Sequence, residues 1–134
     1  MTEPQQEPTE RELQILKVLW ERGEATVREV YEVLREELPI VQNTVQAFLR
    51  VMEQKGFVTH RVDGRSFVYN ARIARDSTSR SLISGLLSTL FDGALDQLVA
   101  SAFDAKRPDP EELARLRSLI DAAESKVAAR RRKS

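Results

Sequence analysis

The sequence predicts a mainly α-helical protein with one small β-hairpin, arranged as two consecutive regions. Apolar residues recur at helical spacing over most of the 134 residues, and strand-like stretches surround the pair Asp63-Gly64. Beyond residue 75 the pattern is helical throughout. We therefore expect a disordered lead-in over residues 1–8, a small mixed domain over 9–74 and an all-α region over 75–134.

The first helix is expected to begin after Thr9. Thr9 and Glu12 have the spacing of a capping box, in which a hydroxyl and a glutamate three residues later each accept a hydrogen bond from the other's backbone amide. Leucines and Trp20 follow at helical spacing, and Gly23 ends the pattern. We expect Trp20 to lie in the core.

A second capping box, Thr26 and Glu29, predicts the next helix. Its apolar stripe reaches Leu38, and Pro39 cannot continue a helix because it has no amide hydrogen. We therefore expect this helix to continue to Leu38 and to stop at Pro39. The first two helices are then short and closely joined.

A third helix is expected over residues 41–55. Its apolar residues have i, i+3, i+4 and i+7 spacing, which places them on one face, and Gly56 stands where a helix commonly ends. The residues expected to face inward are Val45, Phe48, Leu49 and Met52.

Two strands are expected after the third helix, over residues 57–61 and 66–69. The pair Asp63-Gly64 between them is a strong hairpin signal, because glycine adopts the positive φ that tight hairpin turns require. Three helices followed by a hairpin are the element order of a winged helix-turn-helix. The predicted fold is therefore a winged helix-turn-helix followed by an all-α dimerisation segment.

The region from residue 75 onward carries three helical stretches, separated by Asp92-Gly93 and by Pro108 and Pro110. These stretches are short, one-sided and too few to form a large core alone, so we expect them to pair with a second copy of the chain. The alternative is that they fold back onto residues 9–74 of the same chain. The residues assigned to the dimer interface are Leu82, Leu86, Leu90, Phe91, Leu95, Leu98, Leu113, Leu116 and Ile120.

The outward face of the third helix is rich in groups that can contact double-stranded DNA. In a helix-turn-helix the second helix of the pair lies in the major groove, where glutamine and asparagine can bond adenine and arginine can bond guanine or phosphate. Arg61 and Arg65 flank the tip of the hairpin, where a wing can reach the neighbouring DNA backbone or minor groove. The alternative is that this polar face is simply exposed to solvent and contacts no DNA. The candidate DNA-binding residues are Gln42, Asn43, Thr44, Gln46, Arg50, Arg61 and Arg65.

The charges of the chain are segregated although the formal net charge is zero. Residues 41–75 hold six basic and two acidic residues, whereas the first forty residues hold ten of the 21 acidic residues of the chain. The basic stretch can bind phosphate. The alternative function, a winged helix that serves only protein–protein contact, would need no basic patch. The basic tail over residues 130–133 fits a solubilising helix end or a DNA clamp.

The composition excludes most enzyme classes. There is no cysteine and a single histidine, His60, so thiolate metal sites and thiol nucleophiles are excluded and we expect no metal, cofactor or catalytic residue. A surface or half-buried structural role is expected for His60. No apolar run is long enough to span a bilayer and the N-terminus has no apolar signal core, so we expect a cytoplasmic protein without a membrane partner.

A series of short motifs runs in order along most of the chain. They are LKVLW at 16–20, GEATVREV at 23–30, NTV at 43–45, Arg50, KG at 55–56, DGR at 63–65, Tyr69, LFDG at 90–93, LV at 98–99, EEL at 111–113 and LR at 116–117. Through these motifs, residues 9–120 resemble the penicillinase-repressor (BlaI/MecI/CopY) family. The resemblance implies a bacterial repressor that dimerises through its C-terminal helices and binds a palindromic operator, with Gln42, Asn43, Thr44, Gln46 and Arg50 on the recognition helix.

The sequence departs from the family at the positions linked to release of repression. Members that control β-lactam resistance are cleaved after signalling by a membrane sensor, at an Asn-Phe pair that aligns with Ser101-Ala102 here, so this sequence does not support release by that route. An upstream sensor protease is left unidentified. Copper-responsive members use cysteines, and this chain has none. Ala47 stands where a threonine is common, so the operator sequence cannot be transferred.

Overall fold

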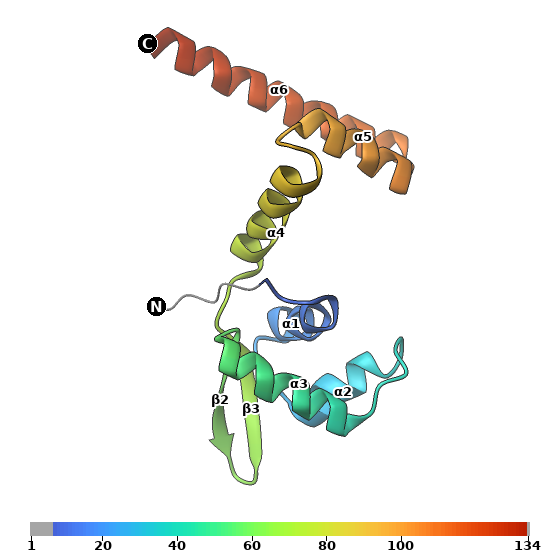
Figure 1. The fold of residues 1–134 in the computed structure, drawn as a ribbon, viewed down its shortest axis with the longest axis vertical. Helices are drawn as coiled ribbons and strands as arrows, with labels where there is room; N and C mark the ends of the chain where they lie inside the picture. Colours follow the sequence, from blue (N-terminus) through green and yellow to red (C-terminus); the bar gives the residue numbers. More distant parts are fainter. Residues whose placement is uncertain (1–6, 134) are drawn as a thin grey trace. The chain divides into compact units, whose positions relative to one another are not determined.

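A computed structural model describes residues 7–133 of the chain (Figure 1). The lead-in predicted over residues 1–8 falls mostly outside the described residues. The chain forms two compact units, with the boundary between Leu86 and Leu87. The elements are α1 (Glu10–Arg22), β1 (Ala25–Thr26), α2 (Val27–Leu34), α3 (Gln42–Lys55), β2 (Val58–Asp63), β3 (Ser66–Ala71), α4 (Arg75–Leu90), α5 (Leu95–Ala105) and α6 (Pro110–Lys133).

Both capping boxes are present. The Thr9 hydroxyl accepts from the Glu12 amide at 3.3 Å, and the Thr9 amide donates to the Glu12 carboxylate at 2.9 Å. The same reciprocal pair joins Thr26 and Glu29, at 3.1 and 2.9 Å. Each box satisfies two amides that have no partner inside their helix, which fixes where α1 and α2 begin.

The expected end of the second helix is wrong by one turn. Helix α2 ends at Leu34, and the amides of Glu37 and Leu38 both donate to the Leu34 carbonyl in a turn. The residue before a proline is biased away from the helical conformation, so Pro39 disfavours helix at Leu38 as well as at its own position. Leu38 still packs against the core, from the turn instead of from the helix.

Helix α3 has the predicted inward face. Val45, Leu49 and Met52 are fully buried and Phe48 is half-buried against the same core. Gly56 follows the helix with φ 88°, a left-handed conformation that glycine adopts without strain. The core shared by α1, α2, α3 and the sheet consists of Ile15, Leu16, Val18, Leu19, Ala25, Val30, Leu34, Val45, Leu49, Met52, Phe57, Val58 and Tyr69.

The sheet has three strands in the order β1-β3-β2, all antiparallel. The hairpin of β2 and β3 is confirmed, with Asp63 paired to Ser66 and Gly64 and Arg65 as a two-residue loop. Gly64 has φ 65° at the first loop position, where tight hairpin turns place glycine. Strand β1 was not predicted, because two residues are too few for a periodic pattern.

Trp20 connects α1 to the segment that precedes α4. Its ring Nε1 donates to the Ile73 carbonyl at 2.9 Å, and the half-buried side chain packs against the core. The expectation that Trp20 is a core residue is confirmed.

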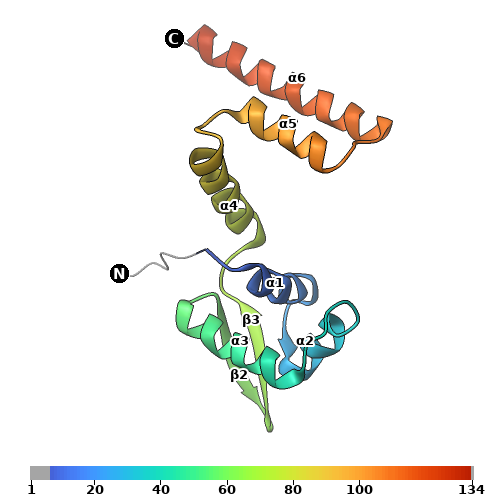
Figure 2. The ribbon, with the colours of Figure 1, turned by 45° about the vertical axis from the view of Figure 1, so that its right-hand side comes forward.

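The helical character of the region beyond residue 75 is confirmed. Asp92 and Gly93, with φ of 51° and 84°, separate α4 from α5. Helices α5 and α6 lie side by side (Figures 1 and 2), and neither contains a buried residue. The expectation that all three helices are short is wrong for α6, which has 24 residues. No single helix of the described chain is long and apolar enough to cross a membrane.

Candidate nucleic-acid interface

Helix α3 presents a polar face because its apolar residues are committed to the core. With Val45, Leu49 and Met52 buried and Phe48 half-buried, most of the other positions of the helix are exposed to solvent. All five candidate residues on this helix are exposed: Gln42, Asn43, Thr44, Gln46 and Arg50. Their side chains are thus available to a partner without any rearrangement of the core.

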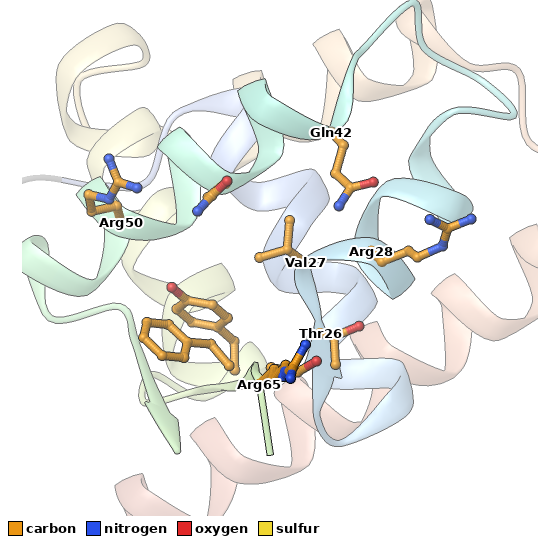
Figure 3. A pocket seen from close by; sticks show the side chains of 10 residues that line it. Thr26, Val27, Arg28, Gln42, Arg50 and Arg65 are labelled. Carbon is orange, nitrogen blue, oxygen red and sulfur yellow. The ribbon is translucent and has the colours of Figure 1, made fainter. Parts of the chain in front are cut away.

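An open hollow of about 350 Å³ lies between this face of α3, the start of α2 and the hairpin (Figure 3). We call it the wing hollow. It brings together four of the predicted DNA contacts: Gln42, Gln46 and Arg50 from α3, and Arg65 from the loop of the hairpin. Its full lining is Thr26, Val27, Arg28, Gln42, Gln46, Arg50, Arg65, Ser66, Phe67 and Tyr69.

The wing hollow is cationic. Arg28, Arg50 and Arg65 contribute side chains from three different elements, and no acidic residue lines it. Arg28 pairs with Glu32 at 3.4 Å, whereas Arg50 and Arg65 form no ion pair within residues 7–133. Two unpaired guanidinium groups beside glutamine amides are suited to phosphate and base edges.

Tyr69 forms part of the lining and has a perturbed hydroxyl. Burial raises its pKa, the negative charge of Glu53 raises it further, and the nearby positive charge of Arg50 lowers it. The net pKa lies above the ordinary value of 10.0, so the phenol stays neutral and can donate a hydrogen bond.

Arg61 lies apart from the other candidates. It is paired with Val68, and alternate residues of a strand point to opposite faces, so Arg61 faces away from Phe67 and Tyr69. Its guanidinium donates to Glu24 at 2.8 Å, and this hydrogen bond, with the charge of Glu24, raises its pKa. Its role as a DNA contact stays a prediction.

Asn43 and Thr44 are also outside the wing hollow. They line a neighbouring groove on α3 together with Phe48 and Lys55. The sequence reasoning missed Thr26 and Arg28, which reach the wing hollow because Thr26 in β1 pairs with Val68 in β3. A pairing between residues this far apart leaves no local sequence signal.

His60 joins the hairpin to α3. Its Nδ1 lies 2.8 and 2.9 Å from the two carboxylate oxygens of Glu53, and its ring stacks on Phe67 at 4.1 Å with an interplanar angle of 17°. His60 is half-buried, which agrees with the structural role expected for it. No cluster of three or more potential metal ligands occurs within residues 7–133.

The residues assigned to a dimer interface fall into two groups. Leu90, Leu95 and Ile120 are 60–66% exposed and Leu86 is 43% exposed, whereas Leu82, Phe91, Leu98, Leu113 and Leu116 are half-buried within the chain. Further exposed apolar residues on the same helices are Ile83, Val99, Phe103, Leu119 and Val127.

A family model described as "Penicillinase repressor" matches residues 8–122. A protein named "Penicillinase repressor" from Bacillus licheniformis is 24% identical over 113 residues, which are 84% of this chain and 88% of that protein. The 16.5 kDa protein in the ptsI 3′ region of Latilactobacillus sakei, described as uncharacterized, is 23% identical over 91% of this chain and 84% of its own length.

Two solved structures are similar over part of the chain. The solution structure of the DNA-binding domain of the repressor BlaI is 30% identical, with a TM-score of 0.48, over 55% of this chain and 88% of that one. The crystal structure of a possible transcriptional regulator for arsenical resistance is 27% identical, with a TM-score of 0.49, over 67% of this chain and 84% of that one.

Proposed function

Because the chain belongs to the penicillinase repressor family, we propose that it is a sequence-specific transcriptional repressor that binds a palindromic operator as a homodimer. The family and the winged-helix fold make it a DNA-binding regulator and point away from an enzyme. The operator symmetry, the dimer and a cytoplasmic location are the parts that we add.

The observation that carries this proposal is the wing hollow. It brings the amide groups of Gln42 and Gln46 into one hollow with the guanidinium groups of Arg50 and Arg65, which form no ion pair within the described part of the chain. Amides discriminate bases, and guanidinium groups hold phosphates at any sequence. A surface with both groups fits an operator better than it fits a nucleic acid bound without sequence preference.

A homodimer is supported by the apolar side chains of α4, α5 and α6. Leu90, Leu95 and Ile120 are largely exposed on elements that contain almost no buried residue, and burial of such surface is the main driving force for association. A two-fold dimer would present two copies of α3 to half-sites separated by whole turns of the duplex, and occupancy of the operator would exclude RNA polymerase.

Release of repression is proposed to act on the same helices. A monomer would keep one half-site and lose the effective concentration of a linked pair, a factor on the order of 10² or more. Ser101 and Ala102 lie exposed in α5, where an Asn-Phe pair would be expected in the cleaved members of the family. We therefore propose that repression is released by a signal other than proteolytic cleavage between Ser101 and Ala102.

The test compares Gln46→Ala with Arg65→Ala on an operator selected from a random duplex library. Gln46→Ala should lower the preference for the operator over random DNA by about tenfold, because a bidentate base contact contributes about 1–3 kcal/mol of discrimination. Arg65→Ala should weaken binding to both duplexes alike and reduce the slope of log K against log salt by about one. Fluorescence anisotropy over a salt series measures both quantities.

Gln97→Ala is the matched control, since Gln97 is exposed on α5 and lies outside the wing hollow. It should leave affinity, preference and salt slope unchanged. If the library yields no enriched sequence and neither Gln46→Ala nor Arg65→Ala changes binding, the proposal is wrong and the protein-interaction alternative takes its place.

A further inference from the structure

Two apolar side chains lie exposed on the hairpin beside its loop. Val62 in β2 and Phe67 in β3 are directly paired, so they lie on one face of the hairpin as neighbours. Val62 is 63% exposed and Phe67 is 46% exposed. We call these two residues the wing pair. Exposed valine and phenylalanine leave apolar surface in water that a partner can bury.

Phe67 of the wing pair is held in a fixed position relative to α3. Phe67 stacks on the ring of His60, and His60 is bonded through Nδ1 to both carboxylate oxygens of Glu53 in α3. Tyr69 completes the cluster, with its ring 5.5 Å from that of His60. The side chain of Phe67 is thus ordered before any partner arrives, which lowers the entropy cost of binding through it.

The wing pair is continuous with the cationic surface. Phe67 lines the wing hollow together with Arg50 and Arg65, and Arg65 is in the loop between the two strands that carry the pair. A partner that fills the wing hollow therefore meets guanidinium groups and an apolar surface at neighbouring positions. Duplex DNA has this pattern, since each anionic phosphate is linked to a deoxyribose whose carbon atoms form the apolar edge of the groove.

We propose that Val62 and Phe67 pack against deoxyribose rings of the bound duplex and add a non-ionic contact next to the phosphate contact of Arg65. Glu53 and His60 are positioning residues for this contact. The inference rests on the proposed function, because it assumes that duplex DNA occupies the wing hollow. It goes beyond that function by assigning part of the affinity to surface burial that salt does not screen.

The test measures the dissociation constant of the full-length protein for a random-sequence duplex over a series of salt concentrations. Phe67→Ser should weaken binding by about fivefold, because about half of a phenylalanine side chain is available for burial. The salt slope should stay unchanged, since no phosphate contact is lost. Phe67→Leu keeps an apolar side chain and should stay within about twofold of the wild type.

Val62→Ser is a second variant at the more exposed position. Val62 lies outside the core cluster and does not take part in the ring stacking of His60, so its substitution leaves the fold intact. Binding should weaken by about threefold, with the salt slope unchanged. The matched control is Val33→Ser in α2, because Val33 is 42% exposed and lies outside the wing hollow. This control should bind as the wild type does.

The positioning role is tested by a double-mutant cycle. His60→Ala should weaken binding when Phe67 is present and should have no further effect in the Phe67→Ser background, because the two residues act through one contact. Additive effects would show that His60 supports the domain in general and would overturn its positioning role. Thermal unfolding of each variant reports the stability of the fold separately.

Three results overturn the proposal in distinguishable ways. If the wild type binds and both Phe67→Ser and Val62→Ser bind equally well, the wing pair makes no contact. If Phe67→Ser lowers the salt slope as Arg65→Ala does, Phe67 acts by holding the loop arginine. If the wild type binds no duplex at all, the proposed function itself fails and the wing contact fails with it.

Discussion

Glu12 is a buried charged residue of the unit that ends at Leu86, which contains α1 to α3 and the hairpin and which we call the winged unit. Its side chain is 2% exposed, and one carboxylate oxygen accepts from the Thr9 amide while the other lies 2.8 Å from the Lys55 ammonium. Burial alone raises its pKa, but the hydrogen bonds from Lys55 and Thr9 outweigh burial and leave the pKa below the ordinary value of 4.5. One carboxylate therefore caps α1 and joins it to the end of α3.

Replacing Glu12 by glutamine should destabilise the winged unit by about 2 kcal/mol at neutral pH, because half-buried Lys55 would lose the one ion-pair partner that it has within residues 7–133. Since the folded pKa of Glu12 is lowered, its contribution is fully present above about pH 4.5 and is lost as the pH falls through the lowered value. The difference between Glu12→Gln and wild type should therefore shrink in acid. Urea unfolding followed by tryptophan fluorescence measures it.

Glu21→Gln provides the control for the pH experiment, since Glu21 is an exposed residue of the same helix. Its substitution should change the free energy of unfolding by less than about 0.5 kcal/mol at every pH. A constant difference between Glu12→Gln and wild type from neutral pH into acid would contradict the role given to the Glu12 carboxylate.

Individual site residues were predictable where a local rule determines them. The exposure of Gln42, Gln46 and Arg50 on α3 was predictable, because the helical period assigns each position of residues 41–55 to a face of the helix. Arg28 was missed because a strand pairing places it, and the pairing of Arg61 with Glu24 depends on which face of the hairpin Arg61 occupies. Such contacts between distant segments follow from tertiary structure alone.

The hairpin shows the same division between local and distant determinants. The pair Asp63-Gly64 predicted it, and Gly64 has the positive φ on which that prediction rests. Its orientation relative to α3 depends instead on His60 and Glu53, whose contact no periodic pattern reveals. The predicted end of α2 is wrong for a related reason, because the apolar stripe continues to Leu38 whereas the helix ends at Leu34.

Gly64→Ala should destabilise the winged unit by about 1 kcal/mol, since an alanine with φ near 65° is strained although no atom lies within 4 Å of the added Cβ. Gly64→Asn should cost less than half as much, because asparagine tolerates this conformation. The measurement is again urea unfolding detected by tryptophan fluorescence. Equal losses for alanine and asparagine would show that side-chain volume, and not φ, determines the stability of the loop.

For the whole chain, the contrast between its two units is the main finding. The unit that contains α1 to α3 has a core of thirteen residues, whereas α5 and α6 contain no buried residue. The sequence predicted the helices of both units, because each is encoded by local spacing. Which residues remain exposed was not predictable, since half-burial of Leu98, Leu113 and Leu116 depends on how the helices lie against one another.

Leu90→Glu should shift the protein from the proposed dimer to a monomer, because a carboxylate in the proposed apolar interface must be desolvated without a partner. We expect the dimer dissociation constant to rise by at least about 100-fold, measured by sedimentation velocity over a range of concentrations. Leu90 is 66% exposed in the single chain, so the substitution spares the fold.

Val41→Glu is the control for the dimer experiment, because Val41 is similarly exposed and lies in the other unit, before α3. It should sediment as the wild type does. A Leu90→Glu protein that remains dimeric would place the interface elsewhere.

The hydrogen bond from Trp20 to the Ile73 carbonyl has a practical consequence. Trp20 is the only tryptophan of the chain, and its acceptor lies two residues before α4. Any process that pulls the start of α4 away from α1 would break this bond and let water reach the indole. The intrinsic emission of the unlabelled protein therefore serves as an optical sensor of this junction, with which candidate releasing signals can be screened.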